Sequence, residues 1–228
     1  MEKRNWKKII GLIVLITLVF SVGYSVVKII MTPEVAIQVG DHTRSDYVLM
    51  LLQCCLGLVV FWLPSMLEKK FSWELPNYMC IMYFVFLYCA IYLGDVRNFY
   101  YIIPHWDTVL HCFSGGMLGA LGFTLVEILN DTKNIKVKLS PVFVCLFAFC
   151  FALAAGVVWE IYEFTGDSLL GLNMQKYRDL NTIFVGRDAL SDTMIDLIVD
   201  TIGAFIVVCF GYLSLKGREK IEEKRNKQ

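Results

Sequence analysis

Charged residues are scarce in this sequence. They make up 18% of its 228 residues, whereas soluble globular proteins carry about 25%. Hydrophobic residues make up 57%, and the mean hydropathy is +0.59. A soluble chain this apolar would have too little polar surface to face water, so we expect much of its surface to face lipid. The formal net charge is +0, which gives no general attraction to nucleic acid, and we expect no nucleic-acid partner.

Several motifs of known chemistry are also missing. The eight cysteines lie in apolar runs and form no CxxC pair, so we expect packing residues rather than disulfides or zinc ligands. The sequence has no serine or cysteine nucleophile elbow and no phosphate-binding glycine loop, which argues against covalent catalysis and nucleotide use. It has no internal repeat and no low-complexity segment, so residues 1–228 are predicted to form a single membrane domain.

Six apolar stretches stand out instead. Each approaches the ~20 residues that cross about 30 Å of hydrocarbon, and in lipid such a segment satisfies its backbone hydrogen bonds as a helix. The sequence therefore predicts an all-α, polytopic transmembrane helical bundle of six helices, multi-pass in the cell membrane. The first stretch continues to Ile30, which is too long for a typical signal peptide, so we expect a retained helix. The stretches are 9–30, 48–64, 78–93, 108–129, 141–162 and 193–215.

Loop charge predicts the orientation of these helices. Most Lys and Arg residues outside the stretches lie at the two termini and in the loops after the second and fourth stretches. Basic residues favour the cytoplasmic side, so both termini are predicted to lie in the cytoplasm. The loops predicted to face outward are 31–47, 94–107 and 164–191. The predicted parts are a three-helix support at 1–103, three helices with a polar cluster at 104–215, and a basic cytoplasmic tail at 216–228.

The polar cluster consists of ionisable residues within the last three stretches. A carboxylate at mid-bilayer costs about 2.5–3.5 kcal/mol, so each should face the bundle interior, water, a cation or a proton. Asp107 and His111 are four residues apart and share one face of the fourth helix. Glu160, Glu163 and Asp167 share a face at the end of the fifth, if that helix continues so far.

The last helix repeats an aspartate every four residues, at Asp192, Asp196 and Asp200, so these three also share one face. In the predicted orientation, all three helices bring their acids near the outer side of the membrane. So many carboxylates in low dielectric cannot all stay ionised, and either several hold protons or a cation lies among them. Carboxylates with one imidazole suit a divalent metal ion, and a two-metal centre would suit hydrolysis of a phosphate or ester.

This hypothesis gives each residue a role. The predicted catalytic residues are Glu160, Glu163 and Asp196. The predicted ligands of a divalent metal ion are Asp107, His111, Glu160, Asp196 and Asp200. In the last outer loop, Arg178 and Arg187 could clamp an anionic group of the substrate, or simply pair with the acids.

Plainer interpretations stay open. His111 alone could be a hydrogen-bonded core histidine. For Glu160, Asp196 and Asp200, which should lie deeper, a functional role or a polar network is the expectation. Residues that could simply be solvated at a membrane surface or helix end are Asp107, Asp192, Glu163 and Asp167.

The same residues carry a resemblance to a known family. The segments are Trp106-Asp107-x-x-x-His111, Trp159-Glu160-x-x-Glu163, Gly171-Leu172-x-x-Gln175, Asp192-Thr193-Met194-x-Asp196 and Gly203-Ala204. Over about residues 104–205 this pattern resembles the YjdF-like family of uncharacterised bacterial inner-membrane proteins. It is more loosely similar to the VanZ-like proteins, which are linked to glycopeptide resistance. The resemblance implies a bacterial plasma membrane location and supports the acidic cluster as the site, but it implies no known reaction.

The sequence thus predicts a metal-dependent hydrolase or transferase that acts on a lipid or envelope substrate near the outer leaflet. Two alternatives remain. The first is a proton- or cation-coupled carrier that uses the same acids as a relay, although such carriers often show repeats or broken helices, which the sequence does not reveal. The second is a non-catalytic membrane scaffold.

Overall fold

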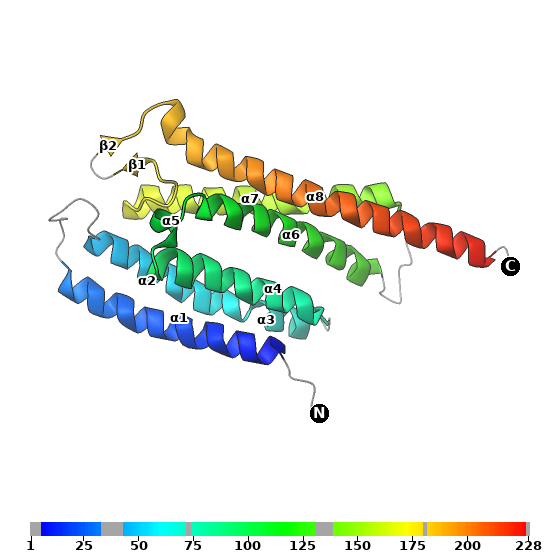
Figure 1. Cartoon of the computed structure of the whole chain (residues 1–228), viewed down its shortest axis with the longest axis horizontal. Helices are drawn as coiled ribbons and strands as arrows, with labels where there is room; N and C mark the ends of the chain where they lie inside the picture. The colour runs from blue at the N-terminus through cyan, green and yellow to red at the C-terminus, as the bar shows by residue number, and fades with distance from the viewer. Residues whose placement is uncertain (1–5, 33–42, 72–73, 131–138, 180–181, 227–228) are drawn as a thin grey trace. The chain divides into compact units, whose positions relative to one another are not determined.

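A computed structural model describes residues 6–32, 43–71, 74–130, 139–179 and 182–226 of this protein. The described residues are almost entirely helical, and six helices are long and apolar enough to cross a membrane (Figure 1). This confirms the predicted all-α architecture with six candidate spans. The spans are Trp6–Met31, Arg44–Lys70, Asn77–Val96, Trp106–Leu129, Pro141–Leu170 and Arg187–Ile221.

The spans expose large apolar side chains, as a surface in hydrocarbon requires. Phe20 and Ile16 in the first span are 67% and 59% exposed. Soluble proteins rarely show such contiguous apolar surface, because it would drive association in water. The chain is therefore a multi-pass membrane protein embedded in a lipid bilayer.

The chain divides into two compact units. The first contains Met1–Leu110 and Gly166–Ala189, and the second contains His111–Thr165 and Leu190–Gln228. The predicted division into 1–103 and 104–215 stays a prediction.

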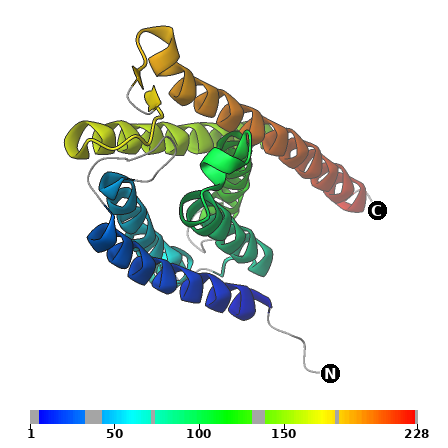
Figure 2. The same cartoon turned by 60° about the vertical axis from the view of Figure 1, so that its left-hand side comes forward.

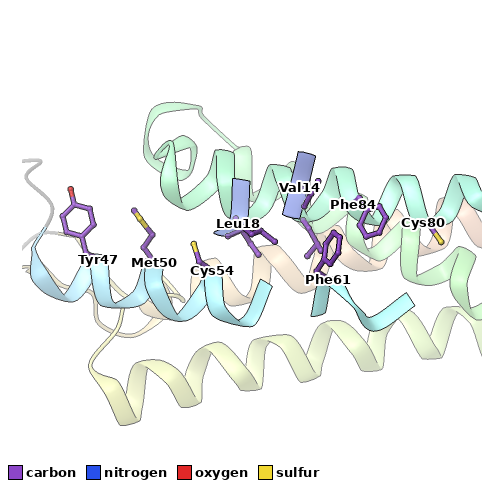
Figure 3. Packing of buried hydrophobic residues seen from close by; sticks show 10 residues of the cluster. Val14, Leu18, Tyr47, Met50, Cys54, Phe61, Cys80 and Phe84 are labelled. Atoms are coloured by element: carbon purple, nitrogen blue, oxygen red, sulfur yellow. The ribbon is translucent and has the colours of Figure 1, made fainter. Parts of the chain in front are cut away.

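Helices α1 (Trp6–Met31), α2 (Arg44–Phe61) and α4 (Asn77–Leu87) pack together in the first unit (Figures 1 and 2). Val14 and Leu18 of α1 are buried against these neighbours, while Phe61 and Phe84 stack with their rings 4.9 Å apart (Figure 3). The buried positions of α1 recur every three or four residues, which places them on one face of the helix. The remaining faces carry the exposed apolar side chains.

Two spans of the first unit are irregular. After α2 ends at Phe61, α3 (Leu63–Phe71) continues the second span, which is longer than the predicted 48–64. Pro64 does not end the helix because it lies in the first turn of α3, where a backbone N–H has no intrahelical partner. In the third span, α4 passes into the π-helix η1 (Tyr88–Val96), and a short helix α5 (Phe99–Ile102) follows.

The second unit is formed by most of α6 (Trp106–Asn130), α7 (Pro141–Leu170) and α8 (Arg187–Asn226). Glycines let these helices approach closely. A Cβ on Gly203 of α8 would overlap the carbonyl oxygen of Cys112 on α6, and one on Gly122 of α6 would lie 2.7 Å from Ala148 Cα on α7. Small residues at helix contacts allow such packing in membranes. The glycines of these helices therefore act in packing.

The connection between α7 and α8 is shorter than the predicted loop 164–191. Residues 164–170 belong to α7, and α8 begins at Arg187, so the prediction was wrong at both ends. Between them, β1 (Arg178–Asp179) pairs antiparallel with β2 (Thr182–Ile183). Of the predicted outer loop 31–47, residues 33–42 lie outside the described residues, and α2 begins at Arg44.

Candidate metal centre

His111 lies at the centre of a buried polar group in the second unit. Its Nδ1 is 3.3 Å from Oδ2 of Asp200, and its Nε2 is 3.8 Å from Oδ2 of Asp196. Asp196 and Asp200 are 2% and 3% exposed, and His111 is 8% exposed. Because the two aspartates are one turn apart on α8, each faces a different ring nitrogen. The four-residue spacing predicted this shared face.

Ser114 joins the group from α6. Its Oγ lies 3.0 Å from Oδ1 of Asp200 and 2.8 Å from the carbonyl oxygen of His111. The hydroxyl has one proton to donate, and both oxygens accept it. Sequence reasoning missed Ser114, because a serine three residues after a histidine is a common and uninformative pattern.

Helix α7 contributes two buried glutamates to the second unit. Glu160 is 5% exposed and Glu163 is 8% exposed. The indole N–H of Trp159 donates to Oε1 of Glu163 at 2.9 Å, one turn along the helix. The interpretation of Glu163 as a solvated residue is therefore wrong. The side chain of Trp159 thus orients this carboxylate.

Asp107 lies one turn before His111 on α6, and its carboxylate forms an ion pair with Lys176. The ammonium of Lys176 also lies 6.0 Å from the ring centre of Tyr100. Lys176 has a φ of 47°, a left-handed conformation that is uncommon for a side chain of this size. No sequence pattern indicates this pair, because 69 residues separate the partners.

The segment that follows α7 is held by its own polar contacts. Asp167, which is 7% exposed, accepts the backbone N–H groups of Met174 and Gln175 at 2.7 and 3.0 Å. The guanidinium of Arg178 donates to the carbonyl oxygen of Gly171 at 3.0 Å. Asp167 thus organises this loop and is not a solvated helix end.

The two predicted substrate-binding arginines have different surroundings. Arg178 holds the loop through Gly171, while Arg187 is exposed at the first turn of α8. Neither observation tests a role in substrate binding, which stays a prediction. Asp192, on the face of α8 that carries Asp196, is only partly buried.

Another carboxylate within a span was missed. Asp95 lies near the end of the π-helix η1, in the third span. The apolar composition ends the predicted third stretch at residue 93, two residues before this carboxylate. Single π-helical turns inside helices are frequent at functional sites.

The chemistry of the buried Asp and His side chains suits a metal ion. The ligand atoms of His111 and Asp196 lie within 4.8 Å of one another. At 3.8 Å, His111 Nε2 and Asp196 Oδ2 are too far apart for a good hydrogen bond. Two ligands at 2.0–2.2 Å from one tetrahedral ion lie about 3.4 Å apart, which is close to this spacing. Imidazole with carboxylates fits Zn²⁺ or Mn²⁺.

These features define a multi-pass membrane protein with a buried Asp/His group that could hold a metal ion. The chain belongs to a family of predicted membrane proteins, DUF2238, which matches residues 25–217. The match begins near the end of the first span and extends into the sixth, so it is wider than the resemblance over residues 104–205. An uncharacterized protein of Thermotoga maritima is 32% identical over 167 residues, which are 72% of this chain and 79% of that protein. No solved structure matches the chain.

Proposed function

We propose that this protein is a metal-dependent membrane hydrolase or transferase acting on a lipid or envelope substrate. The observation that carries the proposal is the spacing of His111 Nε2 and Asp196 Oδ2, which suits two ligands of one divalent ion. Its support is the burial of Glu160 and Glu163 in the same unit. Burying an acid in a membrane span costs free energy, so such a residue is expected to have a functional role.

The proposed roles follow from the contacts. His111 and Asp196 are ligands, and Asp107, one turn before His111 on α6, remains a predicted ligand. A divalent ion held there would supply Lewis-acid activation of a phosphoryl or ester group and of water. Glu160 is the proposed general base. Glu163, whose Oε1 accepts the Trp159 N–H, is held in one orientation and would receive or return a proton through its other oxygen.

The site is proposed to face the outer leaflet. This placement rests on the Lys and Arg distribution, which predicts cytoplasmic termini. In that orientation the C-terminal end of α7 and the N-terminal end of α8 lie on the outer side. Arg178 and Arg187 belong to the segment that joins these ends, and they are proposed to bind an anionic substrate group.

A second candidate is a cation- or proton-coupled carrier, and one observation favours it. The second half of the third span is the π-helix η1, which carries Asp95, and carriers often contain irregular helices. In that function the same acids would pass a cation or proton. Flux of a cation or proton into vesicles that contain the purified protein, without hydrolysis of any lipid, would identify a carrier.

The test of the enzyme proposal is the metal content of the detergent-purified full chain, measured by mass spectrometry. The test variant is Glu160→Gln, Asp196→Asn. The control variant is Glu127→Gln, Asp188→Asn, which removes the same charge from exposed carboxylates on α6 and α8. We expect stoichiometric metal in the wild type and the control, with loss in the test variant. If the wild-type protein binds no metal from solutions of Zn²⁺ or Mn²⁺, the proposal is wrong.

A further inference from the structure

We propose that Asp200 and Ser114 are positioning residues that hold the Nδ1 proton of His111, so that Nε2 is the atom presented to a metal. This assignment replaces the predicted role of Asp200 as a metal ligand. It rests on the proposed function, because it explains how the histidine of that site is oriented. Carboxylates commonly hold the second nitrogen of a metal-binding histidine in this way.

The contacts of Asp200 carry the assignment. Its Oδ2 faces His111 Nδ1 at 3.3 Å, and its Oδ1 faces Ser114 Oγ at 3.0 Å. Both carboxylate oxygens are thus engaged by groups that can donate a proton. An ionised carboxylate only accepts hydrogen bonds, so a ring nitrogen bonded to it must carry the hydrogen. For a neutral ring this leaves the lone pair on Nε2, which faces Asp196.

Ser114 closes a ring of contacts around the histidine. Its hydroxyl lies within hydrogen-bonding distance of the His111 carbonyl oxygen at 2.8 Å and of the Asp200 carboxylate. The backbone of α6 is therefore linked to the same carboxylate that the imidazole contacts. This arrangement restrains both the position of Asp200 and the rotation of the imidazole.

Two glycines make room for the Asp200 side chain. A Cβ on Gly156 of α7 would lie 2.8 Å from Asp200 Oδ2, and a Cβ on Gly115 of α6 would overlap the Asp200 backbone. Any larger residue at either position would displace the carboxylate from His111. Asp200 is therefore fixed from two sides, as a positioning residue requires.

The first measurement is the protonation of the His111 ring, which needs no metal and no activity. The protein has three histidines, so a full-length His42→Gln, His105→Asn background leaves His111 as the only ¹⁵N-histidine signal. Asn suits position 105 because it tolerates the positive φ of 59° there. Solid-state ¹⁵N NMR of metal-free protein in bilayers then shows which ring nitrogen carries a proton.

We expect a proton on Nδ1 in this background and its loss from Nδ1 in the added variant Asp200→Ala. An Nδ1 without a proton in the background protein would overturn the assignment. Ser114→Ala is the second variant, because it deletes one oxygen and retains the helix. It should broaden or split the Nδ1 signal as the carboxylate loses its anchor, and an unchanged signal would contradict a positioning role for Ser114.

The second measurement is the affinity for Zn²⁺, determined by competition with a chelator. Loss of a residue that orients a metal ligand costs about 10- to 100-fold in metal affinity, so we expect this weakening in Ser114→Ala. The control is Thr201→Ala, which removes a hydroxyl that donates to the Leu197 carbonyl oxygen within α8. Wild-type affinity in Ser114→Ala would overturn the positioning role. Failure of the wild type to bind Zn²⁺ would overturn the proposed function, while the NMR result still decides which nitrogen Asp200 holds.

Discussion

His111 Nε2 and Asp196 Oδ2 lie 3.8 Å apart, while the other ring nitrogen of His111 lies 3.3 Å from Asp200. The two aspartates are one turn apart on α8, so one imidazole is flanked by carboxylates at both nitrogens. A hydrogen bond explains the shorter contact, and a shared divalent ion would explain the longer one.

Replacement of His111 by Gln should remove metal binding while leaving the fold intact, because Gln is of similar size and polar. We expect the affinity for Zn²⁺ to fall by at least about 100-fold, since one ligand is lost outright. Chelator competition measures this, with His105→Asn as the control at an exposed position. Equal affinities in the two variants would show that His111 is not a ligand.

Replacement of Gly203 by Ala should destabilise the second unit. The new Cβ would overlap the Cys112 carbonyl oxygen, and backbone atoms cannot move away as a side chain can. Overpacking of this kind costs about 1–3 kcal/mol in the free energy of unfolding. Gly217→Ala is the matched control, because it lies on the same helix and its Cβ would meet no atom within 4 Å. In mixed micelles, the free energy of unfolding should be lower for Gly203→Ala than for Gly217→Ala. Equal stabilities would refute the close packing of α6 and α8.

Asp107 and Lys176 form an ion pair, so the effects of their substitutions on the free energy of unfolding should not be additive. We expect Asp107→Asn and Lys176→Met each to destabilise the protein, and the double variant to cost less than their sum. Contacting residues show coupling energies of about 0.5–3 kcal/mol in a double-mutant cycle. The cycle is measured by thermal or chemical unfolding, and strictly additive effects would show that the pair contributes nothing.

Both termini should lie in the cytoplasm. A green fluorescent protein fused after Gln228 should fluoresce in bacterial cells, because this reporter folds in the cytoplasm, and an alkaline phosphatase fused there should be inactive. Fusions within the loop between α7 and α8 should give the reverse result. An active phosphatase at the C-terminus would contradict the orientation and would move the proposed site to the inner leaflet.

Hydropathy and helical period predicted much of the architecture. Six spans follow from apolar stretches near the length of the bilayer, and the burial of Asp196 and Asp200 follows from their four-residue spacing. These features depend on neighbours along one helix, which a sequence displays directly.

Other parts of the site could not be predicted, because they depend on contacts between distant segments. Nothing near Lys176 in the sequence indicates Asp107 as its partner, and nothing near Ser114 indicates Asp200. The π-helix η1 was also missed, since an extra residue in a helical turn leaves the apolar composition unchanged. The sequence shows which chemical groups the site contains. Whether each carboxylate acts as a ligand, a base or a positioning group depends on contacts between helices, which only the structure shows.

The central claim is that His111 and Asp196 hold one divalent ion. Pulsed electron paramagnetic resonance of Mn²⁺-loaded protein tests it most directly, because a bound histidine gives a ¹⁴N coupling to the metal. In the His42→Gln, His105→Asn background, we predict one such coupling, lost in His111→Gln, together with weaker Mn²⁺ binding in Asp196→Asn. Mn²⁺ bound without any ¹⁴N coupling in that background would contradict the claim.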